Sequence, residues 1–189
     1  NPAHLVGINV AEEIFAEAKQ VAVFDTAFHQ TIPVQAYKYA IPNYLLTENK
    51  VRVYGFHGTS HRYVSQRVCE FLGVDASNQR IITCHIGNGG SITAVLNGKS
   101  IDTSMGLTPV EGLMMGTRSG DVDPGALIYL MEKHNLTAND IQNIINKQSG
   151  VLGITGISSD MREIESADKE GVEIAVLALK MYEQRIIKY

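Results

Sequence analysis

The chain has 189 residues and a net charge of −4; 44% of the residues are hydrophobic and 19% are charged. This composition can form a packed core and argues against a disordered chain. The acidic balance argues against nucleic-acid binding, which requires a basic stripe. No apolar run approaches the roughly 20 residues that span a bilayer, and no signal-peptide pattern opens the chain. We therefore expect a cytoplasmic protein in which Cys69 and Cys84 are buried, reduced thiols.

The first third of the chain predicts a helix and two short strands. Residues 1–20 carry apolar side chains at helical spacing, with charged side chains on the other faces. Residues 21–24 predict a buried strand that ends at Asp25, and residues 51–54 alternate as a second strand does. Between these strands, prolines bound an irregular connector with one short helix near residues 36–39.

A longer helix is expected after this second strand. Thr59 or Ser60 can cap its start, and Gly73 can end it. Four apolar residues form its expected buried face: Val64, Val68, Phe71 and Leu72. This helix should therefore pack on a sheet through an apolar stripe.

A meander of three strands is predicted next, because short turns separate apolar runs. The strands cover residues 81–85, 91–96 and 100–103. Asn97 and Gly98 suit the tight turn between the second and third strands. Strands that follow one another in this way should pair antiparallel.

The rest of the chain predicts one long loop and then helices. Residues 104–122 show little periodicity, and connections of this length are usually functional. The expected helix starts are Asp123 with Pro124, Thr137 with Asp140, Asp160 with Glu163, and Asp168. Gly150 should end the second of these helices. The last helix carries an apolar stripe that we expect to pack in the core: Val172, Ala175, Val176, Leu179 and Ile186.

A Gly-rich turn joins the first two strands of the meander, at residues 85–91 (HIGNGGS). Glycines allow positive φ and the close approach of a ligand, and successive N–H groups form a concavity that suits an anion. A plain hairpin explains the same residues, and the two common nucleotide fingerprints are absent. Two further loops rich in Gly, Thr and Ser, at residues 102–106 and 115–121, weaken the plain-hairpin interpretation. We therefore expect phosphate binding here.

Four side chains near these loops are candidates for chemistry. Asp25 follows a predicted strand, where a carboxylate can hold metal-bound water, orient a cation or bond its own turn. His57 and His61 are four residues apart and could bind a metal, donate to an anion or make structural bonds. The Glu of a His-Glu-x-x-His motif is missing between them. Arg118 lies in a polar loop, from which it can reach a phosphoryl group or remain solvated.

These residues match the requirements of phosphoryl transfer. That reaction needs positioned donors and cations around the transferred group and little covalent help from the protein. A Ser-His-Asp hydrolase does not fit, because no Gly-x-Ser-x-Gly elbow is present. A nucleotide-binding module without catalysis, or a purely structural domain, are the alternatives from other classes. The structural domain leaves the three loops unexplained.

Several long motifs resemble the acetate kinase family, which also includes propionate and butyrate kinases. They are residues 23–29, 54–61, 85–91, 102–109, 111–121 and 149–153, and the resemblance runs in register along the whole chain. It implies a ribonuclease-H-like α/β fold, shared with actin, sugar kinases and Hsp70, in which two duplicated domains each have a mixed sheet with flanking helices. Residues 1–27 would be the tail of the N-terminal domain. Residues 28–189 would form most of the C-terminal nucleotide-binding domain, truncated at its C-terminal end.

The resemblance also implies roles for individual residues. Asp25 matches the active-site aspartate, and His57 and Arg118 match the pair that stabilises the transition state. The matches to ATP-binding residues are His85, Ile86, Gly87, Asn88, Gly89, Asp160, Met161 and Arg162. Phe56 and Pro109 match walls of the pocket for the substrate methyl group. Because the carboxylate acceptor is already ionised, Asp25 need not remove a proton, and we expect it to orient Arg118 or a magnesium-bound water.

The implied reaction is the reversible transfer of the ATP γ-phosphoryl group to acetate, giving acetyl phosphate and ADP. Mg²⁺ and a homodimer are implied with it. A preference for propionate is the alternative within the family. The family's metal-binding Glu and its adenosine motif have no counterpart here, so we expect a piece of a longer protein that is poorly active or inactive alone.

Overall fold

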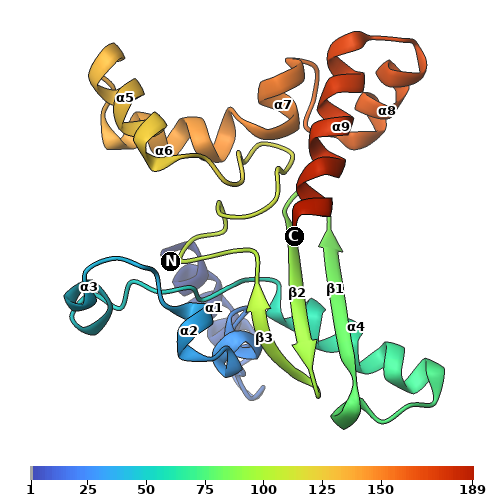
Figure 1. Cartoon of the computed structure of the whole chain (residues 1–189). Coiled ribbons are helices and arrows are strands. Elements are labelled where there is room, and N and C mark those ends of the chain that lie inside the picture. The colour runs from blue at the N-terminus through green and yellow to red at the C-terminus, as the bar shows by residue number, and fades with distance from the viewer. Residues whose placement is uncertain (1) are drawn as a thin grey trace.

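The computed structural model describes residues 2–189, which form an α/β structure around a three-stranded sheet (Figure 1). The strands β1 (Arg80–Ile86), β2 (Gly90–Leu96) and β3 (Lys99–Thr103) follow one another in the sheet, and each neighbouring pair is antiparallel. Asn97 and Gly98 have φ of 52° and 75° and form the turn between β2 and β3. The predicted meander is confirmed. Within the described residues the sheet is antiparallel throughout, whereas the resemblance implies a mixed sheet.

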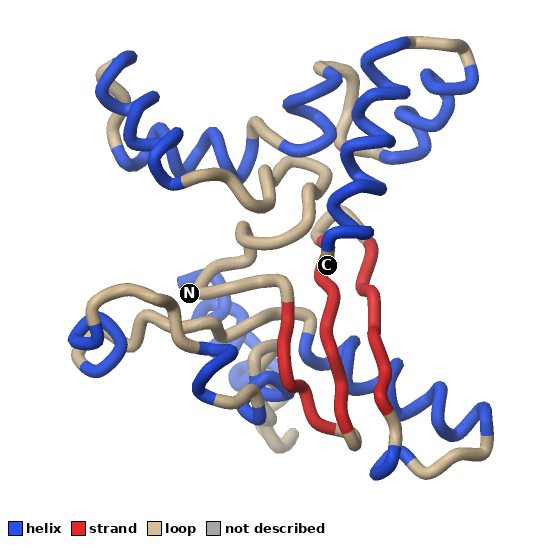
Figure 2. Tube along the Cα trace, in the orientation of Figure 1, coloured by secondary structure: helices blue, strands red, loops and turns tan. Residues whose placement is uncertain are grey.

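The first helices accompany the sheet in one half of the structure, the lower half of Figure 1. They are α1 (Pro2–Ile14), η1 (Ala27–Thr31), α2 (Val34–Tyr37), α3 (Asn43–Thr47), α4 (Gly58–Leu72) and η2 (Ala76–Asn78). Helix α4 packs against β1, and η1 packs against β3. Figure 2 shows α4 passing behind the red strands. No helix among residues 2–189 is long and apolar enough to cross a membrane.

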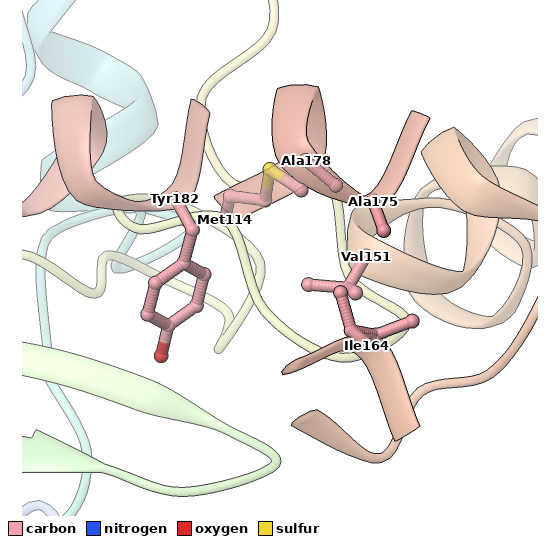
Figure 3. Packing of buried hydrophobic residues seen from close by; sticks show 6 residues of the cluster. All are labelled: Met114, Val151, Ile164, Ala175, Ala178 and Tyr182. Atoms are coloured by element: carbon pink, nitrogen blue, oxygen red, sulfur yellow. The ribbon is translucent and has the colours of Figure 1, made fainter. Parts of the chain in front are cut away.

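The remaining helices form the other half, the upper half of Figure 1. They are α5 (Pro124–His134), α6 (Ala138–Lys147), α7 (Gly150–Thr155), α8 (Met161–Lys169) and α9 (Glu173–Lys188). Asp123 caps α5, Thr137 and Asp140 form a complete capping box at α6, and Asp160 caps α8. Figure 3 shows the apolar core of this half, made by Met114, Val151, Ile164, Ala175, Ala178 and Tyr182.

The long loop between β3 and α5 runs between the two halves and contains neither helix nor strand, as its lack of periodicity predicts (Figure 2). It is nevertheless well anchored, because Met105, Leu113 and Met115 are at most 1% exposed. At its end, the Asp121 carboxylate accepts hydrogen bonds from the Gly112 N–H and the Lys188 ammonium group. The loop is therefore a fixed part of the structure that can position side chains.

Two predicted strands are wrong. Residues 21–24 form no strand, and Val21, Val23 and Phe24 are 81%, 75% and 70% exposed. Residues 51–54 are also irregular; the N–H groups of Val53 and Tyr54 donate to Tyr37 O and Gly106 O rather than to a strand. A strand requires a neighbouring strand to take up its backbone groups, and no described segment pairs with either one.

The buried face of α4 is also wrong, because this helix buries small and polar side chains. His61, Ser65 and Cys69 repeat every four residues and are at most 3% exposed. Of the four expected apolar residues, Val64, Phe71 and Leu72 are exposed and Val68 is partly buried. The helix starts after His57, without a Thr59 or Ser60 cap, and Gly73 ends it as predicted with φ of 65°.

Further boundaries differ from the sequence prediction. Helix α1 ends at Ile14 and buries no residue; α6 ends at Lys147, and Gly150 instead begins α7. Asp168 lies inside α8, while α9 begins at Glu173. The expected stripe of α9 is only partly right, since Ala175, Ala178 and Tyr182 are the buried residues of this helix. Cys69 is buried as expected, whereas Cys84 is exposed.

Candidate active site

The Gly-rich turn connects β1 to β2 and is tied to the long loop. The Gly87 N–H donates to Gly89 O at 2.9 Å, which closes the turn. The Gly116 N–H donates to Asn88 O at 3.0 Å, so the turn and the loop meet there. A Cβ on Gly116 would lie 2.0 Å from Asn88 Oδ1, so a larger residue at this crossing would displace the Asn88 side chain. Two of the three predicted loops are thus held together by backbone contacts.

His57 precedes this turn in the sequence and Arg118 follows it, yet both side chains reach the same residue of the turn, Gly89. A Cβ built on Gly89 would lie 3.3 Å from Arg118 Nη1 and 3.5 Å from His57 Nε2. Arg118 Nη1 also lies 3.5 Å from Pro109 O, at the outer limit of a hydrogen bond. The residues that sequence analysis paired for transition-state stabilisation therefore converge at Gly89. A guanidinium group and an imidazole nitrogen beside a bare glycine backbone form an arrangement that suits an anion.

Asp25 holds the backbone of His57 in an unusual conformation. His57 has φ of 55°, in the left-handed region that side chains rarely adopt. Its N–H donates to Asp25 Oδ2 at 2.7 Å, and the Gly58 N–H donates to Asp25 O at 2.8 Å. No ion pair among the described residues joins Asp25 to Arg118, and the contact that the carboxylate makes is with the His57 backbone; the expected role of Asp25 toward Arg118 or a magnesium-bound water stays a prediction. Phe56, directly before His57, is partly buried.

Three histidines gather at this point, and one hydroxyl group joins two of them. Ser91 Oγ lies 2.9 Å from His57 Nδ1 and 2.7 Å from His61 Nε2. The rings of His57 and His85 stack, and His85 Nδ1 lies 2.9 Å from Ser60 Oγ. The facing nitrogens of His57 and His61 thus share one hydroxyl, an arrangement that fits a hydrogen-bond network rather than a metal pair. Among residues 2–189, no group of three or more acidic, histidine or cysteine side chains could hold a metal ion.

Burial lowers the pKa of three imidazoles in this region, those of His29, His57 and His61. Burial lowers the pKa of His57, and His85 and Arg118 lower it further, while Asp25 opposes them. Burial, followed by the three neighbouring histidines, lowers the pKa of His61 to about 3. Burial also lowers the pKa of His29, whose Nε2 lies 2.9 Å from Phe56 O. The site at neutral pH therefore combines one permanent cation, Arg118, with neutral His29, His57 and His61.

A hollow of about 640 Å³ lies beside the turn, between β1, the long loop and α8. Its lining consists of Ile86, Gly87, Asn88, Gly116, Ser159, Asp160, Met161, Glu165 and Tyr182. Five of the eight residues predicted to bind ATP belong to this lining. His85, Gly89 and Arg162 do not: the first two lie at the histidine cluster, and the Arg162 side chain is 89% exposed.

Asp160 has a structural task in the lining as well. Its Oδ1 accepts from the Arg162 backbone N–H at 3.0 Å, which caps α8. Its carboxylate also bonds the Arg162 guanidinium, and these hydrogen bonds lower the Asp160 pKa to about 2. The expected reciprocal bond from Glu163 does not form among the described hydrogen bonds. The predicted cap is confirmed, and a contact of Asp160 with nucleotide stays a prediction.

Sequence reasoning missed several residues of this site. Ser91 is in the Gly-rich motif but received no role, although its hydroxyl joins two histidines. Gly116 and Ser159 adjoin predicted residues, so their positions in the sequence were a usable signal. Glu165 and Tyr182 carry no such signal, because only the packing of α8 against α9 brings them to the hollow.

Comparison with known proteins identifies the family of this chain. The model of the acetokinase family matches residues 1–189, and the chain belongs to this family. The acetate kinase of Phocaeicola vulgatus is 64% identical over 189 residues, which are 100% of this chain and 48% of that protein. The crystal structure of Porphyromonas gingivalis acetate kinase has a TM-score of 0.96 and 60% identity, and the match covers 100% of this chain and 47% of that one.

A relative of another name is also similar. The crystal structure of a propionate kinase from Francisella tularensis has a TM-score of 0.95 at 50% identity, over 99% of this chain and 48% of that one. The chain spans about half the length of the curated relatives it matches, 48% for the first of them.

Proposed function

We propose that this protein transfers the γ-phosphoryl group of ATP reversibly to acetate, giving acetyl phosphate and ADP. The observation that carries the proposal is the convergence of His57 Nε2 and Arg118 Nη1 on Gly89, next to the hollow. The acceptor is a carboxylate and is already ionised at neutral pH, so no general base is required. What the reaction requires is charge stabilisation and alignment, and these residues supply both.

In this mechanism each residue has a separate task. The phosphates of ATP lie along the turn at residues 85–89, and the nucleotide extends into the hollow toward residues 160–162. Arg118 and His57 donate to the equatorial oxygens of the phosphoryl group during transfer. Asp25 fixes the backbone of His57 and its charge acts on the ring. Phe56 and Pro109, which adjoin these donors, face the methyl group of acetate.

Mg²⁺ is expected to enter with the nucleotide, because it binds phosphate oxygens and keeps several water ligands. The described residues do not by themselves form a metal site, so no step of the mechanism is assigned to the ion.

We also propose a homodimer, by resemblance to the family. The two domains of the duplicated fold would place residues 1–27 and 28–189 on different sides of the nucleotide.

Propionate is the second candidate acceptor, because a relative of 50% identity is described as a propionate kinase. One methylene is worth only about 1–3 kcal/mol in a pocket, so small changes around Phe56 and Pro109 decide the preference.

The test is the formation of acyl phosphate, trapped with hydroxylamine, by the protein expressed from its complete gene. Hydroxamate formation that requires both ATP and the acid supports the proposal. ATP binding without hydroxamate would instead identify a nucleotide-binding module.

A further inference from the structure

A continuous chain of hydrogen bonds leads from the interior to His57. Thr83 Oγ1 lies 2.7 Å from His61 Nδ1, and His61 Nε2 lies 2.7 Å from Ser91 Oγ. Ser91 Oγ then lies 2.9 Å from His57 Nδ1. Thr83, His61 and Ser91 are at most 3% exposed, so water does not compete for these groups. The chain ends at His57 Nε2, beside Gly89 and Arg118.

The protons of this chain can be arranged in only two ways. A hydroxyl carries one hydrogen and can accept two hydrogen bonds, and a neutral imidazole carries one N–H and one acceptor nitrogen. Among the described hydrogen bonds, the buried Ser91 hydroxyl has only the two imidazoles as partners, so it donates to one and accepts from the other. Every link must therefore point in the same direction. If Thr83 donates to His61, then His61 donates to Ser91 and Ser91 donates to His57, whose own proton is on Nε2. In the reverse arrangement the proton of His57 is on Nδ1, and Nε2 presents a lone pair to the ligand.

The distances favour the first arrangement. In the reverse one, the Thr83 hydroxyl must donate elsewhere, and the acceptor it reaches is Thr93 O at 3.4 Å. In the first, the same hydroxyl donates to His61 Nδ1 at 2.7 Å, the usual length of a hydroxyl bond. An anion at Nε2 adds to this preference, because it binds an N–H and repels a lone pair.

We propose that Thr83, His61 and Ser91 are positioning residues that hold neutral His57 as its Nε2–H tautomer, so that the uncharged ring donates to the phosphoryl group. The identity of this ligand rests on the proposed function, whereas the tautomer does not. His57 is an uncharged donor because its neighbours disfavour a second positive charge. The His85 ring stacks on the His57 ring with 4.0 Å between centroids, and Arg118 Nη1 converges on the same glycine. The His61 ring centroid lies 6.4 Å away, and His29 also disfavours a charge on His57, whereas Asp25 alone acts in the other direction.

The test uses nitrogen NMR of the full-length protein labelled with ¹⁵N-histidine, which distinguishes the two tautomers directly. We expect His57 to carry its proton on Nε2 at neutral pH. We also expect kcat to be constant from about pH 7 to about pH 9, because the proposed donor is a neutral imidazole and has no imidazolium proton to lose in this range. A proton on Nδ1 of wild-type His57, or a kcat that falls through this range, would overturn the proposal.

Two matched variants separate positioning from folding. Ser91→Ala removes the hydroxyl that donates to His57 Nδ1, and we expect a two- to tenfold lower kcat, about the value of one hydrogen bond, with a mixture of His57 tautomers. The control is Thr93→Val, which removes a hydroxyl group on the same strand. This hydroxyl bonds Thr103 and is not part of the chain that leads to His57, so we expect kcat and the His57 tautomer to be unchanged. Ser91→Thr keeps the hydroxyl and should restore most of the rate.

The positioning role and the proposed function are contradicted by different outcomes. If wild type and Ser91→Ala have the same His57 tautomer and the same kcat, Ser91 does not position His57. If Ser91→Ala does not fold, the tautomer of the wild type decides alone. An Nε2–H His57 in a protein without turnover would leave the tautomer assignment intact and overturn the proposed function instead.

Discussion

The rings of His57 and His85 stack face to face, with 4.0 Å between their centroids and 23° between their planes. This contact joins the residue that precedes α4 to the end of β1, and thereby fixes two of the predicted motifs to each other. A positive charge on the His57 ring would act on a second imidazole at short range. The stack therefore both orients His57 and favours its neutral form.

Gly89 lies where the His57 and Arg118 side chains converge, so its substitution tests this position. In Gly89→Ala the new Cβ meets Arg118 Nη1 at 3.3 Å and His57 Nε2 at 3.5 Å, so the methyl group occupies the place where the donors converge. We expect kcat to fall by about tenfold or more while the protein remains folded, because misplaced donors no longer stabilise the transition state. Steady-state kinetics and circular dichroism measure the two effects.

The control is Gly7→Ala, where a Cβ meets nothing within 4 Å in an exposed helix. This variant should retain full activity, since alanine is a better helix former than glycine. Equal activity of Gly89→Ala and wild type would show that the phosphoryl group does not lie at this position.

Asp25 can be tested for charge separately from shape. In Asp25→Asn the amide oxygen can still accept from the His57 N–H, which the carboxylate holds at 2.7 Å, but the negative charge is lost. We expect turnover to fall strongly, by about tenfold or more, because a neutral amide holds the His57 N–H less firmly than the charge-assisted bond of the carboxylate does, and His57 is then misplaced. Thermal unfolding should change little. An unchanged rate in Asp25→Asn would reject the assignment of Asp25 to the active site.

The buried histidines should make the protein sensitive to mild acid. Their pKa values are lowered in the folded state, to about 3 for His61, whereas an unfolded histidine titrates near about 6.5. Below that pH the unfolded chain binds protons that the folded chain excludes, so stability falls as the pH decreases. The expected loss is about 1.4 kcal/mol per pH unit for each such histidine. Urea unfolding at about pH 7, 6 and 5 measures it.

Two variants serve this measurement. His61→Gln removes one buried titrating group and should give a shallower dependence of stability on pH, although from a lower starting value. His134→Gln changes an exposed histidine and should leave the dependence as it is. A slope that is the same in wild type and His61→Gln would contradict the account.

Asp160 combines a helix cap with a predicted nucleotide contact, and two substitutions distinguish them. Asp160→Asn keeps an oxygen for the Arg162 N–H, so the cap of α8 persists, whereas Asp160→Ala removes it. We expect the alanine variant alone to lower the melting temperature, by a few degrees. Weaker ATP binding in both variants would support the nucleotide contact, and unchanged binding in both would leave only the cap.

Local signals predicted the local features of this fold. The turn at Asn97 and Gly98, the meander and the caps Asp123 and Thr137 depend on neighbours in sequence, and all are confirmed. Burial was less predictable, because it depends on which segments pack together. Helix α4 turns His61 and two other small or polar residues toward β1, and this face has no apolar pattern to reveal it.

The same distinction applies to the site. The sequence motifs indicated Asp25, His57, the Gly-rich turn and Arg118 one by one, because each residue type suits phosphate chemistry. Nothing local could show that His57 and Arg118 meet at Gly89, or that Ser91 connects two histidines. These contacts join residues distant in sequence, and only the folded arrangement of α4, the sheet and the long loop creates them.

The central claim is that Arg118 and His57 stabilise phosphoryl transfer to acetate. Its most direct test is the trapping of acyl phosphate with hydroxylamine, using the protein expressed from its complete gene, with acetate, propionate and butyrate as acceptors. The test variant is Arg118→Ala. Its control is Arg67→Ala, which removes an exposed arginine from a surface ion pair.

We predict turnover that prefers acetate, falls by about 10³-fold or more in Arg118→Ala, and is unchanged in Arg67→Ala. A preference for propionate would keep the mechanism and change the substrate. Full turnover in Arg118→Ala, or no turnover of any of the three acids by a folded wild-type protein that binds ATP, would contradict the account.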